Sequence, residues 1–328
     1  MNGTEQKELI IYIRNNIPEK YINKLTELGA TVLLEPWTYG ENEPSVKHDL
    51  SACTIVLTLG LNDPLTIMKV APNIQWVQSI SVGTDSLLNE NTINSNIVIT
   101  NTKGCTSIPI AEHTIAMMSS FARCIPTLLH NQQSRRWENT SITDLEGSTV
   151  GIIGYGEIGK EIAKRCKAFD MTVIGCRKRP NRTGEDDPAD KVVGLEEMDM
   201  VIKASDFLVL ALPSTSETYH SINKDKLSLM KSTSFLINIG RGNTIAEQDL
   251  LKVLQAKKIA GAALDVFDIE PLRKNHPFWE LDNVIISPHN AYFSPKSMER
   301  YMNIFFKNIQ RFQNDQPLIN IVDKNLGY

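Results

Sequence analysis

A short apolar run followed by three regularly spaced glycines constrains the fold of this chain more than any other feature. The run is Thr149–Ile153, and the glycines are Gly154, Gly156 and Gly159. In a strand–turn–helix unit with this spacing, the first glycine allows a tight turn and the second lets the backbone approach a pyrophosphate. The third allows the helix to pack closely on the strand. We therefore predict a dinucleotide-binding site at the amino end of a helix that begins near Glu157.

The residues around the glycines strengthen this interpretation, because glycines with the same spacing also occur in ordinary turns. Apolar side chains recur at helical spacing after the turn, and a second apolar run, Met171–Cys176, follows. Strand, helix and second strand together form a βαβ unit.

A basic run, Arg177-Lys178-Arg179, directly follows that second strand. NAD sites usually place an acidic side chain there to bind the ribose 2′-hydroxyl, whereas NADP sites use arginine to bind a 2′-phosphate. No acidic residue occurs between Asp170 and Glu185. The run is also compatible with a solvated loop or an address signal, but its position favours NADP(H), with NAD as a possible second cofactor.

Length and composition set broad limits on the fold and on the partners. A chain of 328 residues with 41% hydrophobic and 22% charged residues is expected to form two globular domains. The net charge of −4 argues against nucleic-acid or membrane partners. Five scattered cysteines without metal-ligand spacing are typical of a reduced cytoplasm, and we expect no metal site.

Short apolar runs alternate with helical patterns along the whole chain, which predicts an α/β fold with two open parallel sheets. We expect a Rossmann-type dinucleotide-binding domain at residues 102–291. It is inserted in a flavodoxin-like substrate domain made of residues 1–101 and 292–328, with the last helical pattern packing back on the first domain. A long helix is expected from Ser107 to Ile125, ended or kinked by Pro126, and residues 180–191 are expected to be a loop.

Two further features have alternative interpretations. The small-residue loop Ser79–Asp85 follows a strand, where ligands bind in open sheets, although Gly83 could simply serve a turn. His113 lies on the long helix, where a single histidine is more often a packing residue than a ligand.

Three groups that can carry chemistry follow predicted strands of the second domain: Arg241, Glu270 and His289. The carboxyl ends of parallel strands meet at one edge of the sheet, near the expected cofactor. Taken singly, each could be an ordinary surface or loop residue.

With the glycine turn, these segments resemble the D-isomer-specific 2-hydroxyacid dehydrogenase family over nearly the full chain. The matching motifs are Gly151–Gly159, Asn238–Gly242, Gly261–Pro271 and Ser287–His289. The residues near Val82 match more loosely.

The resemblance implies hydride transfer between a nicotinamide cofactor and C2 of a 2-keto or D-2-hydroxy acid, as in glyoxylate/hydroxypyruvate reductases. It implies that His289 is the acid/base, that Glu270 supports it and that Arg241 binds the substrate. Backbone N–H groups of Val82 and Gly83 would bind the substrate carboxylate, and Asp265 the nicotinamide carboxamide. The cofactor-binding residues implied in this way are Gly154, Tyr155, Gly156, Glu157, Ile158, Gly159, Arg177, Lys178, Arg179, Pro213, Thr218, Ile239, Gly240, Arg241, Asp265 and His289.

Other functions remain open at this level. One is an NAD-dependent D-2-hydroxyacid or phosphoglycerate dehydrogenase, and another is a non-enzymatic dinucleotide-sensing co-repressor, which would need the cofactor cleft but no proton donor. Glu270 argues against a formate dehydrogenase, which needs no proton transfer. The family is usually dimeric, so the resemblance implies a homodimer with Trp137 at the interface, unless Trp137 is a core residue.

Overall fold

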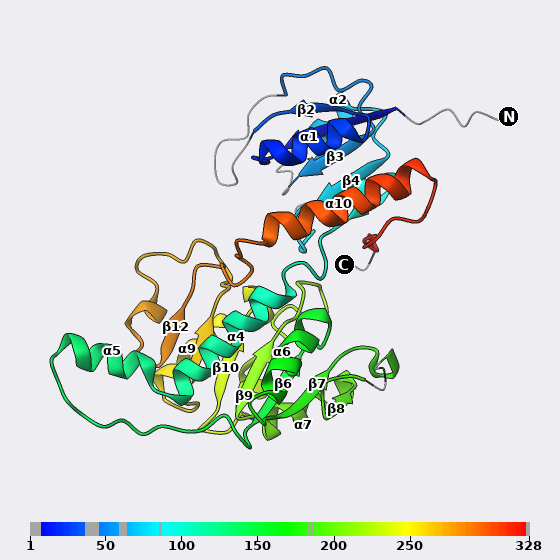
Figure 1. Cartoon of the computed structure of the whole chain (residues 1–328). Helices are drawn as coiled ribbons and strands as arrows, with labels where there is room; N and C mark the ends of the chain where they lie inside the picture. The colour runs from blue at the N-terminus through cyan, green and yellow to red at the C-terminus, as the bar shows by residue number, and fades with distance from the viewer. Residues whose placement is uncertain are drawn as a thin grey trace. The chain divides into compact units, whose positions relative to one another are not determined.

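The computed structural model describes residues 8–36, 46–58, 64–84, 87–182, 184 and 186–325. The chain divides into two compact units (Figure 1). The first comprises Met1–Cys105 together with Pro295–Tyr328, and the second comprises Thr106–Ser294. The predicted domain boundaries lie only a few residues earlier in the chain.

The first unit contains a five-stranded, wholly parallel sheet in the order β2-β1-β3-β4-β5. Its strands are β1 (Leu9–Arg14), β2 (Ala30–Leu34), β3 (Ile55–Thr58), β4 (Trp76–Ser79) and β5 (Val98–Thr100). This order is the flavodoxin-like one. The predicted fold of the first unit is therefore confirmed.

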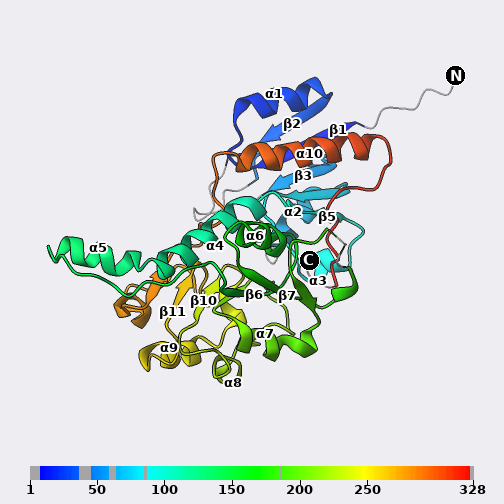
Figure 2. The same cartoon turned by 60° about the horizontal axis from the view of Figure 1, so that its bottom comes forward.

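Helices cover both faces of this sheet. On one face, α1 (Glu19–Glu27) and α10 (Ser297–Gln313) share a core with the strands, in which Leu25 of α1 and Phe305 of α10 are both buried. On the other face lies α2 (Pro64–Val70), with the short α3 (Glu90–Ile93) nearby in the chain. The apolar residues of α10 recur every three or four positions, which gives the helix one buried face. The last part of the chain therefore completes the first unit, as Figure 2 also shows.

The second unit contains a seven-stranded parallel sheet in the order β12-β11-β10-β9-β6-β7-β8. Its strands are β6 (Thr149–Ile153), β7 (Thr172–Cys176), β8 (Lys191–Val193), β9 (Phe207–Leu210), β10 (Phe235–Asn238), β11 (Gly261–Leu264) and β12 (Val284–Ile286). The order contains the Rossmann arrangement with one strand added at the edge. The Rossmann-type prediction is confirmed, although β8 at the other edge, which begins at the last residue of the predicted loop, was not predicted as a strand.

Two apolar cores lie on the two faces of the second sheet. One involves α4 (Ser107–Ala122) and α6 (Glu157–Lys167). The other involves α7 (Met198–Ala204), α8 (Lys224–Leu227) and α9 (Glu247–Gln255). Short 3-10 helices occupy several loops: η1 (Pro180–Arg182), η2 (Leu195–Glu197), η3 (Gly242–Thr244) and η4 (Pro277–Glu280).

The predicted long helix is present as α4, but it ends three residues before the predicted Ile125, and a second helix that was not predicted follows it. The first, α4, ends at Ala122, and Cys124 adopts a left-handed conformation with φ 52°. A new helix, α5 (Ile125–Gln133), then begins with Pro126 in its first turn, where the missing N–H of proline costs no hydrogen bond. Pro126 therefore starts a helix instead of ending one. No helix in the described part of the chain is long and apolar enough to cross a membrane.

Candidate active site

The glycine turn between β6 and α6 has the geometry that its spacing predicts. Gly154 has φ +92°, and a Cβ atom there would lie 2.5 Å from the carbonyl oxygen of Ala211, so no other residue fits. A Cβ on Gly159 would lie 3.0 Å from the ring of Tyr155, which accounts for the close helix packing. A Cβ on Gly156 would meet only the Gly154 oxygen, at 4.0 Å, so the backbone there is open to a ligand. Glu157 and Ile158 form the first turn of α6.

Tyr155 does not point outward from this turn. Its side chain is 1% exposed, and its ring fills the space beside Gly175, where a Cβ would lie 2.5 Å away. Burial, together with a hydrogen bond to Asp187, raises the pKa of the Tyr155 hydroxyl. Only the backbone of Tyr155 remains to contact a cofactor.

Asp187 is a residue that sequence reasoning missed. It comes from the segment expected to be a loop, yet its carboxylate accepts the hydroxyl of Tyr155 and lies 3.3 Å from Lys160 Nζ on α6. Its pKa is lowered, because these partners outweigh the effect of burial. Asp187 therefore supports the glycine turn through its contacts with Tyr155 and Lys160.

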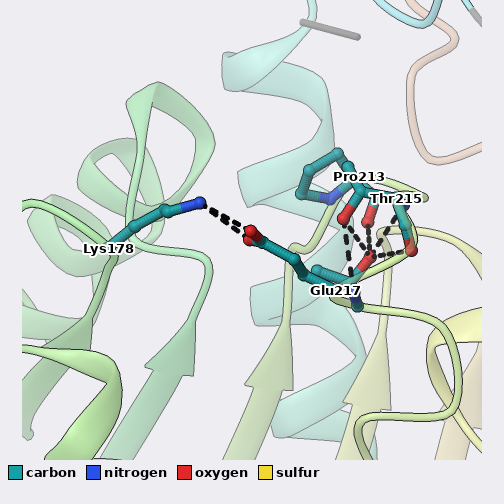
Figure 3. Close-up of polar contacts among 5 residues, drawn as sticks. Lys178, Pro213, Thr215 and Glu217 are labelled. Atoms are coloured by element: carbon teal, nitrogen blue, oxygen red, sulfur yellow. Dashed lines mark hydrogen bonds and ion pairs between the residues drawn. The ribbon is translucent and has the colours of Figure 1, made fainter. Parts of the chain in front are cut away.

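The basic run begins immediately after β7. Arg177 N–H donates to the Val193 carbonyl at 3.0 Å, which ties the start of the run to the edge strand β8. Lys178 Nζ donates to both carboxylate oxygens of Glu217, at 3.0 and 2.8 Å. Figure 3 shows these two side chains reaching toward one another from separate loops. The position after β7 thus does have an acidic neighbour, supplied by the loop after β9, and Arg179 is exposed.

The loop that carries Glu217 is held by its own hydrogen bonds. Thr218 Oγ1 donates to the Pro213 carbonyl at 2.7 Å and accepts the N–H of Thr215 at 2.8 Å (Figure 3). The hydroxyl of Thr218 therefore stabilises this loop. The cofactor contacts predicted for Pro213 and Thr218 remain predictions.

His289 and Glu270 form a close pair. His289 follows β12 and has φ 51°, a left-handed conformation that is uncommon outside glycine. Its Nδ1 lies 2.7 Å from Glu270 Oε2, while Glu270 Oε1 accepts the N–H of Phe267 at 2.9 Å. Both side chains retain solvent access, with exposed fractions of 41% and 34%. The imidazole Nε2 is therefore the ring atom left to exchange a proton with a ligand.

Arg241 follows β10 and contributes its charge to this pair. Partial burial alone would raise the pKa of Glu270, but the bonds from His289 and Phe267 and the nearby charges of His289 and Arg241 lower it. Arg241 also donates from NH1 to the Gly240 carbonyl at 2.9 Å. The ends of β10, β11 and β12 thus bring a guanidinium, a carboxylate and an imidazole together.

The two residues before Arg241 contribute to the packing of the fold, and their predicted contacts with the cofactor remain predictions. Ile239 is buried in the core that contains α4 and α6. A Cβ on Gly240 would lie 2.6 Å from the Leu212 carbonyl oxygen, and its N–H donates to Asn238 Oδ1 at 3.1 Å. They allow the β9 and β10 loops to approach closely.

Asp265, at the end of β11, is a buried anchor for the loop that carries His289. It is 2% exposed and accepts the Ser287 hydroxyl at 2.5 Å on Oδ1. It also accepts the N–H groups of Asn290 and Ala291, each at 3.0 Å. The carboxylate therefore holds the chain on both sides of His289, and its contact with a nicotinamide carboxamide remains a prediction.

His113 extends this anchor to α4. Its Nε2 lies 3.2 Å from Ser287 Oγ and 3.9 Å from Asp265 Oδ1. Burial lowers the pKa of His113, with the charge of Asp265 acting in the opposite direction. The sequence favoured a packing role, and no local signal could have shown that His113 contacts a loop 174 residues away.

The residues predicted to bind a substrate carboxylate belong to the first unit. Val82 and Gly83 follow the carboxyl end of β4, and the Val82 carbonyl accepts Asn101 Nδ2 at 2.9 Å. Asp85, at the end of the same loop, lies outside the described residues. Among the residues that the structure describes, no cluster of histidine, cysteine or acidic side chains could hold a metal ion.

Comparison with known proteins agrees with this arrangement. The family model for the D-isomer specific 2-hydroxyacid dehydrogenase, NAD binding domain, matches residues 115–291. The glyoxylate reductase of Pyrococcus furiosus is 31% identical over 330 residues, covering 96% of each chain. The D-3-phosphoglycerate dehydrogenase of Methanocaldococcus jannaschii is 29% identical over 95% of this chain and 59% of its own.

A solved structure shows the same fold over the whole chain. The D-isomer specific 2-hydroxyacid dehydrogenase of Xanthobacter autotrophicus, in complex with NADPH and MES, has a TM-score of 0.84 and 26% identity, covering 98% of this chain and all of that one. The chain belongs to the D-isomer-specific 2-hydroxyacid dehydrogenase family.

Proposed function

We propose that this enzyme reduces a small 2-keto acid to the D-2-hydroxy acid, and catalyses the reverse reaction, with NADP(H) as the preferred cofactor. The observation that carries the proposal is the His289–Glu270 pair, 2.7 Å apart, with the charge of Arg241 beside it. The resemblance to glyoxylate reductases indicates small substrates such as glyoxylate and hydroxypyruvate.

The proton chemistry follows from which atoms are engaged. In reduction, His289 donates a proton from Nε2 to the carbonyl oxygen, because Nδ1 is occupied by Glu270. Glu270 stabilises the imidazolium before the transfer, and its lowered pKa keeps it charged for this role. In oxidation, neutral His289 accepts the hydroxyl proton at the same atom.

We propose that Arg241 holds the substrate. A guanidinium presents a rigid fork of donors, so Arg241 can bind a carboxylate and polarise the adjacent carbonyl. The N–H groups of Val82 and Gly83 would bind the carboxylate from the loop after β4. Neither role requires these groups to change protonation state.

The residues present fit a nicotinamide dinucleotide. The backbone is open at Gly156, and the eleven-residue helix α6 begins next to it. Its free N–H groups and dipole favour the pyrophosphate, and Asp265 and His289 would face the nicotinamide end. When bound, this cofactor supplies or accepts the hydride at C2 of the substrate.

The preference for NADP(H) is supported by Arg177, Lys178 and Arg179 after β7. The Xanthobacter relative was solved with NADPH, which agrees with this proposal. An NAD-dependent dehydrogenase is the second candidate, favoured by the similarity to a D-3-phosphoglycerate dehydrogenase and by the acidic Glu217 beside Lys178.

We also propose that the protein is a homodimer in a reduced, cytoplasmic compartment. Trp137 is fully exposed, with a relative accessibility of 103%, so the alternative that it is a core residue is wrong. Leu128, Leu129 and Ile142 are also exposed in α5 and the segment after it, and an apolar arm of this kind is typical of an interface. All five cysteines are free, as expected in a reducing compartment.

A panel of 2-keto acids assayed with NADPH and with NADH tests the proposed function. We expect turnover of glyoxylate or hydroxypyruvate, with the higher kcat/KM for NADPH. Phosphohydroxypyruvate as the best substrate, with NADH as the better cofactor, would establish the second candidate instead. Binding of the nucleotide without turnover of any keto acid would refute both.

A further inference from the structure

We propose that His113 is a positioning residue for the reaction: it donates a hydrogen bond from Nε2 to Ser287 and thereby fixes the loop that presents His289. The inference rests on the proposed acid/base role of His289. It concerns a histidine on α4 whose side chain contacts Ser287 and Asp265.

His113, Ser287 and Asp265 are linked by a chain of hydrogen bonds, and the direction of each bond follows from which atoms can donate and which can accept. Asp265 accepts two backbone N–H groups and lies 2.5 Å from Ser287 Oγ, so the single hydroxyl hydrogen of Ser287 points to Asp265. Ser287 Oγ can therefore only accept from His113 Nε2, 3.2 Å away. The hydrogen of a neutral His113 must then be on Nε2, and the bonds run His113 to Ser287 to Asp265.

These hydrogen bonds end at the loop that carries His289, so the N–H of His113 bears on the position of the proposed acid/base. Asp265 binds the loop at Ser287 on one side of His289 and at Asn290 and Ala291 on the other. His289 between them has φ 51°, a left-handed conformation that is uncommon for a residue with a Cβ atom. The anchor must therefore hold its own orientation firmly.

The contact between His113 and Ser287 is shielded from water. The His113 side chain is 18% exposed and Asp265 is 2% exposed, so water has little access to replace a lost donor at Ser287. Without His113, the Ser287 hydroxyl could rotate and release Asp265 Oδ1, which would loosen the loop before Asn290. A shift of about 1 Å at the acid/base can cost up to about a hundredfold in rate.

The test compares His113→Phe with His113→Gln. Phenylalanine preserves a planar apolar ring without a donor, whereas the glutamine amide nitrogen can occupy the place of Nε2 and donate to Ser287. We expect the phenylalanine variant to lose about tenfold in kcat, with the KM for NADPH and the melting temperature close to wild type. The glutamine variant should recover kcat to within about threefold of wild type, since a neutral amide–hydroxyl bond is of similar strength.

Two further measurements separate positioning from a general structural role. The solvent deuterium isotope effect on kcat should rise in His113→Phe, because a misplaced His289 makes proton transfer more rate-limiting. Ser287→Ala removes the same bond from its acceptor side. Its effect should not add to that of His113→Phe in the double variant, since both act through one chain.

Several outcomes would overturn the proposal. These are an unchanged kcat in His113→Phe, a glutamine variant no better than phenylalanine, or additive losses in the double variant. If His113→Phe does not fold, Ser287→Ala, which lacks the bond, can be compared with His113→Gln, which keeps it. Failure of the proposed function is distinguishable, because His289→Ala would then retain activity, whereas failure of this inference leaves His289→Ala inactive and His113→Phe active.

Discussion

Two regions of the second unit, the His289–Glu270 pair and the basic run Arg177–Arg179, hold their charged groups in different ways. The His289–Glu270 pair is tied to backbone N–H groups and to Asp265, which is almost fully buried. Lys178 and Glu217 instead bind one another as side chains that are 49% and 67% exposed. An exposed ion pair contributes only about 0.2–1 kcal/mol, so it yields easily to a ligand, whereas buried hydrogen bonds resist displacement.

This difference separates two tasks within one sheet edge. Chemistry needs an acid/base already in its reactive position, and the proposed acid/base, His289, is held by fixed bonds at the ends of β11 and β12. Discrimination between two cofactors that differ by one phosphate needs charges that can rearrange around that phosphate. The predictions below test each end, beginning with the largest effect.

Replacing His289 by alanine should abolish the proton transfer while leaving cofactor binding intact. We expect kcat for keto-acid reduction to fall by about 10²–10⁴, because general acid catalysis is lost. NADPH affinity, measured by fluorescence titration, should change little, since the proposed phosphate contacts come from other residues, at the glycine turn and after β7. Near wild-type turnover by the variant would show that His289 is only a structural residue at the end of β12.

Reversing the charge of Arg177 should act only at the cofactor. In Arg177→Asp we expect kcat/KM for NADPH to fall by roughly tenfold or more, because a charge-assisted phosphate contact contributes about 1.5–3 kcal/mol. Activity with NADH should be retained. Lys203→Asp, an exposed position on α7, is the control with a comparable charge change. Wild-type enzyme that uses NADH as well as NADPH would contradict the proposed preference.

Glu270→Gln should shift the pH profile of reduction. The reaction requires protonated His289, so kcat/KM falls at high pH. Removing the anionic partner should move this falling limb to lower pH, and oxidation should then reach its plateau at lower pH. In the wild type, the lowered pKa of Glu270 keeps the carboxylate charged well into the acidic range. Asp268→Asn, on the same loop, should leave the profile unchanged.

Glu217→Gln should have the smallest effect and the opposite direction from Arg177→Asp. Because Glu217 competes with a 2′-phosphate for Lys178, its removal should tighten NADPH binding by roughly two- to fivefold and leave NADH affinity unchanged. The gain should decline as salt concentration rises. Weaker NADPH binding would mean that Glu217 orients Lys178 for the phosphate, and Glu280→Gln on η4 serves as the control.

Local patterns in the sequence were sufficient for most of the architecture. Buried strands appear as apolar runs, and the turn at Gly154 requires a glycine because of its positive φ and its closeness to Ala211. The order of strands and helices then limits the topology to the two observed sheets. The boundary between α4 and α5 was misjudged, because the apolar spacing continues across Cys124 and a proline can begin a helix as well as end one.

The sequence by itself determined the two α/β sheets, the glycine turn and the three chemical groups at strand ends, because each depends on residues close together in the chain. Only the tertiary structure decided which groups pair: Tyr155 with Asp187 across 32 residues, Lys178 with Glu217 across 39, and His113 with Ser287 across 174. Such pairings depend on where separate loops meet at the sheet edge. Hydrophobic periodicity describes which face of an element is buried, but it contains no information about which polar side chains from distant loops come within hydrogen-bonding distance.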